Sequence, residues 1–258
     1  MKKLSAGKVN RILRRHQLWL DGAVGGKCAH FHDVDLREFD FVGRDLRKAT
    51  FVRTNLGGAS FRRCVLNEVL FQDSDLSGAD LSYAQLIKTT FETVNLNAVD
   101  FGGARLYDIK IYHSNLYYAD LRTADMSNVH YDSSTSFLAM QCPEEGSFVG
   151  WKAAVSKNKG VYVILKVLIP EDALRTSGTD RECWASKITV LDIQDIEGNS
   201  LQENSALNLY DFKYEYKKGE TAAAKYYSGN RWDNSEKGIH FWITREEALR
   251  DIRYLGRL

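Results

Sequence analysis

Residues 79–101, ADLSYAQLIKTTFETVNLNAVDF, decide the fold of the first half of the chain. An apolar residue stands at every fifth position of this stretch, starting with Leu81 and Leu86. The same spacing continues without a break through all 21 such positions between Phe31 and Tyr131. Because a period of five fits neither a helix, with about 3.6 residues a turn, nor a strand, with about two, the chain has to turn at each repeat.

The likeness of residues 20 positions apart shows how the repeats stack. If four repeats close one square coil, each residue lies beside the residue 20 positions later. One such column reads Phe31, Phe51, Phe71, Phe91, Ile111 and Tyr131, and the next reads Leu36, Leu56, Leu76, Leu96 and Leu116. Slim residues such as Ala79 and Ala84, two positions before the apolar ones, leave room for the corners. We therefore predict a solenoid of about five coils filled by ladders of Phe and Leu.

Three repeats carry a recognisable motif: Ala79-Asp80-Leu81, Ala119-Asp120-Leu121 and Ala124-Asp125-Met126. They resemble the pentapeptide-repeat family, whose units wind an all-β right-handed quadrilateral β-helix. The resemblance covers residues 29–131 and implies this fold. It implies no single function, because such rods carry many tasks.

The segment before the solenoid, residues 1–28, predicts a helical cap. Val9, Ile12 and Leu13 stand near helical spacing within residues 5–20, and a stacked coil has an open end that a helix can cover. The alternative is a basic surface that binds nucleic acid through Lys8, Arg11, Arg14 and Arg15. We favour the cap.

After Tyr131 the fivefold spacing ends, and residues 132–136 suggest a linker to a small α+β domain over residues 132–258. Its expected strands are residues 161–169, 188–193, 212–216 and 239–243. Thr244 and Glu247 form the capping box of a helix that runs to Leu255. The blocks at 142–151, 168–173 and 238–248 resemble an uncharacterised domain that follows pentapeptide repeats in phage and prophage proteins, a resemblance that implies no activity and no catalytic residue.

The composition is that of a globular chain. Its 258 residues are 44% hydrophobic with a net charge of +1, which excludes a disordered chain or a polyelectrolyte. The longest apolar run, residues 161–169, is too short to cross a bilayer, and no signal-peptide core precedes it, so we expect a cytoplasmic protein of a bacterial host without membrane contact. Four widely spaced cysteines suggest neither a disulfide framework nor a metal site, and no cofactor is implied.

One column of acidic residues, Asp80, Asp100 and Asp120, has two interpretations. Such side chains commonly accept backbone N–H bonds in turns. The family resemblance offers the other interpretation, because some members imitate a DNA duplex for gyrase with acidic side chains. Residues 31–65 carry seven basic and five acidic side chains, so the first half of the rod is not acidic. This favours turn capping.

Outward positions near the second end of the rod are rich in tyrosine, and exposed aromatic side chains usually mark an interface. The five are Tyr83, Tyr107, Tyr112, Tyr117 and Tyr118. We expect these tyrosines to contact the chain's own C-terminal domain rather than an external partner. Because the helix and the C-terminal domain would cover both ends of the rod, we expect a monomer or a weak homodimer.

The C-terminal domain contains one candidate pocket. His240 and Trp242 share a face of a predicted strand, with Trp232 nearby, and one interpretation is an aromatic-walled pocket that holds an imidazole. A structural histidine is the simpler interpretation. The chain contains no phosphate-binding loop, GxSxG or HExxH sequence, and we predict no catalytic residue.

Three functions follow from these observations. The favoured one is a non-enzymatic phage-type interaction protein that binds and modulates a host macromolecule, such as gyrase or an antiphage defence protein. The second is a small-molecule or nucleotide-binding protein or enzyme with its pocket at His240. The third is nucleic-acid binding through the basic N-terminal end.

Overall fold

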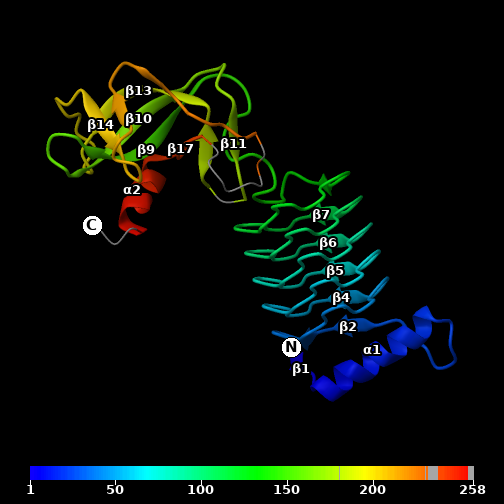
Figure 1. Cartoon of the computed structure of the whole chain (residues 1–258). Coiled ribbons are helices and arrows are strands. Elements are labelled where there is room, and N and C mark those ends of the chain that lie inside the picture. Colours follow the sequence, from blue (N-terminus) through cyan, green and yellow to red (C-terminus); the bar gives the residue numbers. More distant parts are fainter. Residues whose placement is uncertain (180, 230, 232–237, 255–258) are drawn as a thin grey trace. The chain divides into compact units, whose positions relative to one another are not determined.

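The computed structural model describes residues 1–179, 181–229, 231 and 238–254 and divides the chain into two compact units, Met1–Ala139 and Met140–Leu258. The first unit is the solenoid and the second is a β-rich domain with one helix (Figure 1).

One face of the solenoid is a parallel six-stranded sheet in the order β2-β4-β5-β6-β7-β8. Its strands are β2 (His30–His32), β4 (Thr50–Val52), β5 (Leu70–Gln72), β6 (Thr90–Glu92), β7 (Lys110–Tyr112) and β8 (His130–Tyr131). The register joins residues 20 positions apart, such as Phe31 to Phe51. Single parallel bridges such as Asp40 to Ser60 join the coils on the other faces with the same offset. The four-repeat coil predicted from the sequence is therefore confirmed.

Stacked side chains fill the interior of the coil. The rings of Phe51 and Phe71 are parallel with centroids 5.0 Å apart, and Phe71 and Phe91 follow at 5.1 Å. All three side chains have no exposed surface. The stacking and the complete burial of these rings stabilise the rod.

The corners of the coil adopt left-handed backbone conformations. Glycine stands at some of them, such as Gly103 with φ of 67°, but other residues stand at most of them, such as Tyr83 with φ of 59°. This conformation costs a non-glycine residue about 1 kcal/mol. Hydrogen bonds between coils offset the cost, because the Tyr83 N–H donates to the Gly102 carbonyl at 2.9 Å.

The N-terminal segment covers the first coil. The short strand β1 (Lys2–Lys3) pairs in parallel with β3 (Val34–Asp35), a pairing the sequence did not suggest. Helix α1 (Ala6–Leu20) matches the predicted helix and buries Val9, Leu13 and His16. His16 Nδ1 accepts a hydrogen bond of 3.1 Å from the Ala29 N–H, which anchors the helix where the first coil begins (Figure 1).

Residues 132–136, interpreted above as a linker, instead continue the last coil. Ser136 forms a parallel bridge with Asn115, and the Thr135 hydroxyl donates to the Ile111 carbonyl at 2.8 Å. Asp132 accepts bonds from the Thr135 N–H and from its hydroxyl, which shapes the turn. The two units accordingly divide after Ala139 rather than after Tyr131.

The C-terminal unit contains a six-stranded antiparallel sheet and a three-stranded one. The larger sheet has the order β15-β14-β9-β10-β13-β16, and the smaller has the order β11-β12-β17. The strands of the larger sheet are β9 (Phe148–Ser156), β10 (Tyr162–Ile169), β13 (Lys187–Gln194), β14 (Ser205–Asn208), β15 (Glu215–Lys217) and β16 (Thr221–Ala223). Those of the smaller sheet are β11 (Arg175–Ser177), β12 (Cys183–Ala185) and β17 (Ile239–Phe241).

Helix α2 (Arg245–Tyr254) packs its Ala248, Leu249 and Ile252 onto β9 and β10. The capping box at its start is confirmed. The Thr244 N–H donates to Glu247 Oε2 at 3.0 Å, and the Glu247 N–H donates to Thr244 Oγ1 at 3.3 Å. Neither α1 nor α2, the two helices within the described residues, has the length and apolar character that crossing a bilayer requires.

Two expectations about strands differ from the structure. The predicted strand at 212–216 begins only at Glu215, and Phe212 is exposed in a turn. The long strand β9 was not predicted, because its sequence FVGWKAAVS lacks the alternation of polar and apolar residues that marks a strand with one solvated face. Its last five residues are all buried.

Candidate functional site

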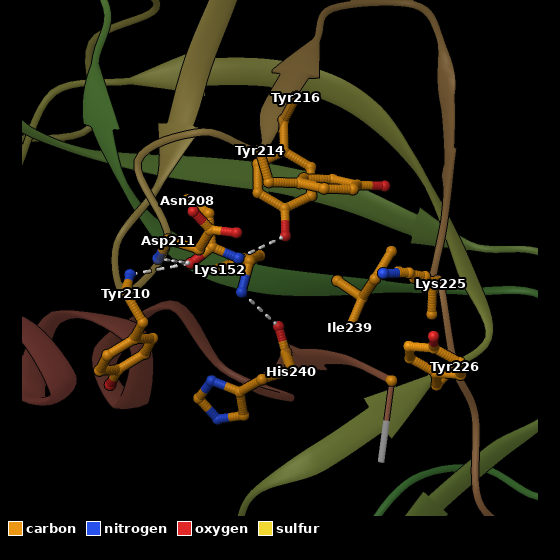
Figure 2. A pocket seen from close by; sticks show the side chains of 12 residues that line it. Lys152, Asn208, Tyr210, Asp211, Tyr214, Tyr216, Lys225, Tyr226, Ile239 and His240 are labelled. Carbon is orange, nitrogen blue, oxygen red and sulfur yellow. Dashed lines mark hydrogen bonds between the residues drawn. The ribbon is translucent and has the colours of Figure 1, made fainter. Parts of the chain in front are cut away.

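A cavity of about 480 Å³ opens in the C-terminal unit beside strands β9, β14, β15 and β17 (Figure 2). We call it the Lys152 cavity. Its lining residues are Lys152, Asn208, Tyr210, Asp211, Tyr214, Tyr216, Ala224, Lys225, Tyr226, Gly238, Ile239 and His240. Tyrosine is the commonest residue type among them. The volume of the cavity is typical of a small-molecule site.

Lys152, on β9, is the buried cation of this cavity. Its side chain is directed at the backbone carbonyl of His240, to which its Nζ donates a hydrogen bond of 2.9 Å (Figure 2). Nζ also lies 5.5 Å from the centre of the Tyr216 ring. Burial lowers the pKa of Lys152 to about 8. The amine therefore titrates near physiological pH, whereas an exposed lysine titrates at about pH 10.4.

His240, on β17, contributes its backbone and its ring to the cavity. The ring lies 5.8 Å from that of Trp184 and 5.0 Å from that of Trp242. Its Nε2 atom is buried and has no hydrogen-bond partner within the part of the chain that the structure describes. Burial, with a smaller contribution from the Lys152 charge, lowers the pKa of His240 to about 3. The imidazole is therefore neutral at physiological pH.

The sequence located this cavity only in part. His240 lines it, whereas Trp242 packs beside His240 and donates from Nε1 to Asp251 Oδ2 at 3.4 Å. Trp232, the third expected residue, lies outside the described residues. Lys152 and the tyrosines were missed. The sequence indicated the tyrosines only by their close spacing between residues 208 and 216. No sequence pattern marked Lys152 as a cavity residue.

Hydrogen bonds hold several of the cavity tyrosines in place. The Tyr214 hydroxyl donates to the Ala223 carbonyl at 2.8 Å, and the Tyr210 hydroxyl donates to Asp251 Oδ1 at 2.8 Å. The Asn208 amide donates to the Tyr216 hydroxyl at 3.1 Å. These bonds order the aromatic wall before any ligand arrives, which lowers the entropy cost of binding.

The solenoid carries a second hollow, of about 530 Å³, on the face that holds the acidic column. We call it the face groove. It is lined by Arg62, Asp80, Ser82, Tyr83, Asp100, Gly102, Asp120, Arg122 and Thr123. Tyr83 is 59% exposed, and the Arg62 guanidinium lies 5.8 Å from the centre of its ring.

The three aspartates of the face groove make the hydrogen bonds expected of turn caps. Oδ1 of Asp80 accepts from the Ser82 N–H at 2.9 Å, and Oδ1 of Asp100 accepts from the Gly102 N–H at 2.7 Å. Asp120 accepts from the Arg122 N–H and from its guanidinium, and the guanidinium bond is the main cause that lowers the pKa of Asp120. Each carboxylate thus satisfies a corner amide of its own coil.

We expect replacement of Asp100 with Ala to lower the free energy of unfolding of the solenoid by about 1 kcal/mol, because the Gly102 N–H loses its acceptor. Asp100→Asn keeps an oxygen at the same position and is expected to cost less than about 0.5 kcal/mol. Urea unfolding followed by circular dichroism measures both variants. If Asn is as disruptive as Ala, the charge rather than the acceptor matters, and turn capping is the wrong explanation.

The five predicted interface tyrosines do not form one patch. The coil register places Tyr83, Tyr107 and Tyr112 on three different faces, and Tyr117 and Tyr118 share the fourth. The Tyr117 ring lies 4.4 Å from that of Tyr118 and 4.9 Å from that of Phe137, which belongs to the same unit. The two most exposed of the five are Tyr83 at 59% and Tyr118 at 57%.

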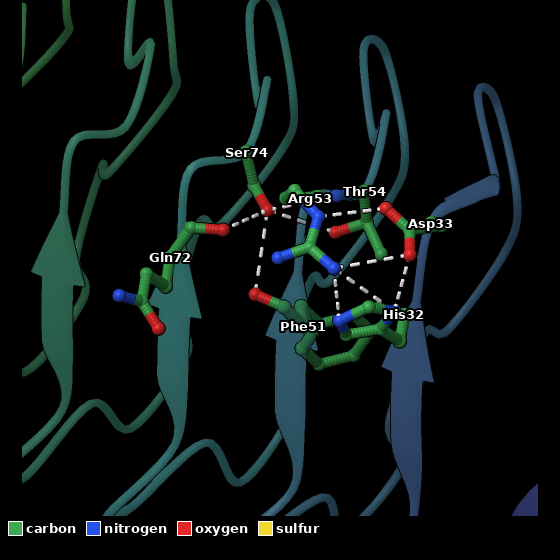
Figure 3. Close-up of polar contacts among 7 residues, drawn as sticks. All are labelled: His32, Asp33, Phe51, Arg53, Thr54, Gln72 and Ser74. Atoms are coloured by element: carbon green, nitrogen blue, oxygen red, sulfur yellow. Dashed lines mark hydrogen bonds and ion pairs between the residues drawn. The ribbon is translucent and has the colours of Figure 1, made fainter. Parts of the chain in front are cut away.

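Basic residues near the first end are exposed or paired. Lys8, Arg11, Arg14 and Arg15 are all exposed on α1, and Arg15 donates from Nε to the Gly25 carbonyl at 3.3 Å. On the sheet face, Arg53 reaches the preceding coil, where its Nε donates to Asp33 Oδ1 at 2.7 Å and its guanidinium also contacts His32 (Figure 3). The bond from Arg53 lowers the pKa of Asp33.

Cysteines distant in sequence meet inside the C-terminal unit. Cys142 and Cys183 are both buried in its core, and a hydrogen bond with Cys183 lowers the pKa of the Cys142 thiol. Neither of these two cysteines forms a disulfide. Within the described ranges, no cluster of three His, Cys, Asp or Glu side chains has the geometry to hold a metal ion.

Comparison with known proteins identifies both halves. Residues 45–121 match the family model of the pentapeptide repeat region, and residues 138–248 match that of a family of unknown function, DUF5758. No curated protein matches the chain.

Among solved structures, a pentapeptide repeat protein of the cyanobacterium Cyanothece 51142 is 20% identical, with 49% of this chain and 97% of that chain covered and a TM-score of 0.43. One from the thylakoid lumen of Arabidopsis thaliana is 30% identical, with 38% and 69% covered and a TM-score of 0.38. QnrB1, a plasmid-mediated fluoroquinolone resistance protein, is 13% identical, with 42% and 85% covered and a TM-score of 0.29.

Proposed function

Because the chain joins a pentapeptide-repeat region to a domain of the DUF5758 family, we propose that it is a non-enzymatic interaction protein whose solenoid presents the face groove to a protein partner. In this proposal the chain is a phage or prophage protein. Its partner is a macromolecule of the bacterial host, such as gyrase or an antiphage defence protein. That part rests on the resemblance of the sequence to these families alone.

The rigidity of the rod supports this function. Its coils are joined by regular hydrogen bonds between residues 19 to 21 positions apart, such as Phe61 N–H to the Asp80 carbonyl at 2.7 Å. Its interior is filled by stacked Phe rings, such as Phe41 on Phe61 and Phe51 on Phe71, and by ladders of Leu. A surface held this firmly loses little conformational entropy when a partner binds.

The single observation that carries the proposal is the position of Tyr83. Tyr83 is 59% exposed, so its ring does not fill the core of the rod. Gly103 stands at the equivalent corner of the next coil, and a Cβ there would lie 2.8 Å from the Tyr83 ring. The Tyr83 ring therefore packs against the next coil at Gly103, and its exposed surface is available to a partner as an aromatic anchor.

Charge in the face groove favours a partner that presents a basic side chain. Asp120 is paired with Arg122, and Arg62 stands over Tyr83. Asp80 and Asp100 accept bonds from the neutral groups of Ser82 and Gly102, and both side chains line the groove. An arginine stacked on Tyr83 could pair with either of them. Within this proposal the chain acts as a monomer or weak homodimer, since the groove lies within one copy.

Affinity purification of the tagged full-length protein from a bacterial lysate, with quantitative mass spectrometry, tests the proposal. We expect a stoichiometric protein that wild type captures and that Tyr83→Ala loses at least about tenfold, the effect of removing an aromatic anchor. Tyr107→Ala is the matched control, because Tyr107 is an exposed tyrosine on another face.

The variant Tyr117→Ala with Tyr118→Ala asks whether the other exposed pair is the docking point instead. Loss of the same protein in that variant, with Tyr83→Ala unaffected, would move the interface away from the face groove. Recovery of no protein above background by wild type would contradict the proposed function altogether.

A further inference from the structure

Among the described residues, the charge of Lys152 has no counterion within ion-pair distance. Its Nζ donates to one backbone carbonyl, and the described residues offer it no ion pair. The one carboxylate that acts on it through space is Asp251. Both oxygens of Asp251 already accept bonds, one from Tyr210 and one from Trp242.

This arrangement is unfavourable for the protein alone. Lys152 is 3% exposed, and a buried ammonium without a partner carries a large desolvation cost. An ammonium has three donors, and the single carbonyl acceptor satisfies one of them. An anion in the cavity would supply both the missing charge and the missing acceptors.

The walls of the cavity suit a flat ligand. Tyr210, Tyr214 and Tyr226 line it, and Tyr226 lies beneath the Lys225 ammonium, which is 5.1 Å from the centre of its ring. Figure 2 shows Tyr214 and Tyr216 on one side of Lys152, with Lys225 and Tyr226 set apart from them on another. Aromatic walls around a buried cation favour a ring that carries a negative group.

We propose that the Lys152 cavity binds a small aromatic anion, whose acidic group pairs with Lys152 and whose ring packs against the cavity tyrosines. Lys225 at the wall strengthens the preference for an anion, and Asp211 is the one carboxylate among the lining residues. Nothing in this site depends on the face groove, so the inference goes beyond the interaction function and stands or falls separately from it.

The experiment uses a matched pair of fluorescent probes with the full-length protein. Anilinonaphthalene sulfonate is an aromatic anion, and phenylnaphthylamine is its uncharged counterpart. We expect saturable sulfonate binding at one site per chain, with the dissociation constant raised at least about tenfold in Lys152→Met. The same variant is expected to change the dissociation constant of phenylnaphthylamine less than about twofold.

Two controls separate the cavity from other effects. Lys213→Met removes an exposed lysine near the cavity and is expected to leave sulfonate binding unchanged. Tyr83→Ala, which tests the interaction function, is also expected to leave it unchanged. Circular dichroism and the thermal midpoint report whether Lys152→Met is folded.

Three outcomes would overturn the proposal. They are the absence of saturable sulfonate binding by wild type, equal sulfonate affinity in folded Lys152→Met, and an equal loss of affinity for the uncharged probe. The last would mean that the substitution closes the cavity rather than removing a charge that recognises the ligand.

Discussion

Replacing Phe71 with Ala is expected to lower the free energy of unfolding of the solenoid by about 4 kcal/mol. The side chain is fully buried, and its ring stacks on those of Phe51 and Phe91 at 5.0 and 5.1 Å. It also meets the Phe61 ring edge-on at 5.9 Å. The coils above and below cannot collapse into the space, because their hydrogen bonds set their spacing.

Amide hydrogen exchange measured by mass spectrometry tests this prediction in the full-length protein. Protection should fall in residues 31–131 and stay unchanged in residues 140–254, because each compact unit has a hydrophobic core of its own. Gln72→Ala is the matched control, since Gln72 is the next residue of β5 and is partly exposed. If the protection lost in Phe71→Ala is no greater than in Gln72→Ala, the ring ladder is not the source of stability.

Replacing Lys152 with Met is expected to raise the free energy of unfolding of the C-terminal unit by about 2 kcal/mol at pH 7. The pKa of Lys152 falls from 10.5 to about 8 on folding. Holding the proton at pH 7 therefore costs the folded state about 3 kcal/mol. Met fills a similar volume and removes this cost. The loss of the hydrogen bond to the His240 carbonyl offsets about 1 kcal/mol of the resulting stabilisation.

The pH dependence gives the sign of this effect a separate test. The depressed pKa means that the unfolded chain binds more protons than the folded one between about pH 8 and 10.5, so this lysine makes wild-type stability rise with pH there. The advantage of Lys152→Met should shrink across that window and reverse by about 1 kcal/mol above it. His240 stays neutral throughout, because its pKa lies far below this window.

Lys166→Met is the control for this series, because Lys166 also lies on a central strand beside an aromatic ring, that of Trp151, and is partly exposed. It is expected to change the free energy of unfolding by less than about 0.5 kcal/mol. A destabilised Lys152→Met at pH 7, or a difference from wild type that is constant from pH 7 to 10.5, would show that the amine is not a buried charge.

The acidic column and the tyrosines show which features of the solenoid surface can be predicted from the sequence period. The turn-capping role of Asp80 and Asp100 followed from residue type and spacing, and the structure shows those hydrogen bonds. The five tyrosines do not form the predicted cluster. The 20-residue register would have shown this, because residues at different positions of the register lie on different faces of the coil.

The amino-acid sequence alone determined the architecture of the coils between Phe31 and Tyr131, because the backbone hydrogen bonds that join neighbouring coils link residues 19 to 21 positions apart. Once the five- and 20-residue periods are recognised, the partner of Phe71 or Asp100 can be counted along the chain. Helix α2 was also readable, since its capping box spans only Thr244 to Glu247.

Only the tertiary structure decided the rest of the C-terminal unit. Its sheet places β14 beside β9 and β13 beside β16, and it brings Lys152 to His240 across 88 positions of sequence. Cys142 meets Cys183 in the same way. No local pattern encodes such pairings, because they depend on which strands bury one another's apolar faces, and that choice is made by the packing of the whole unit.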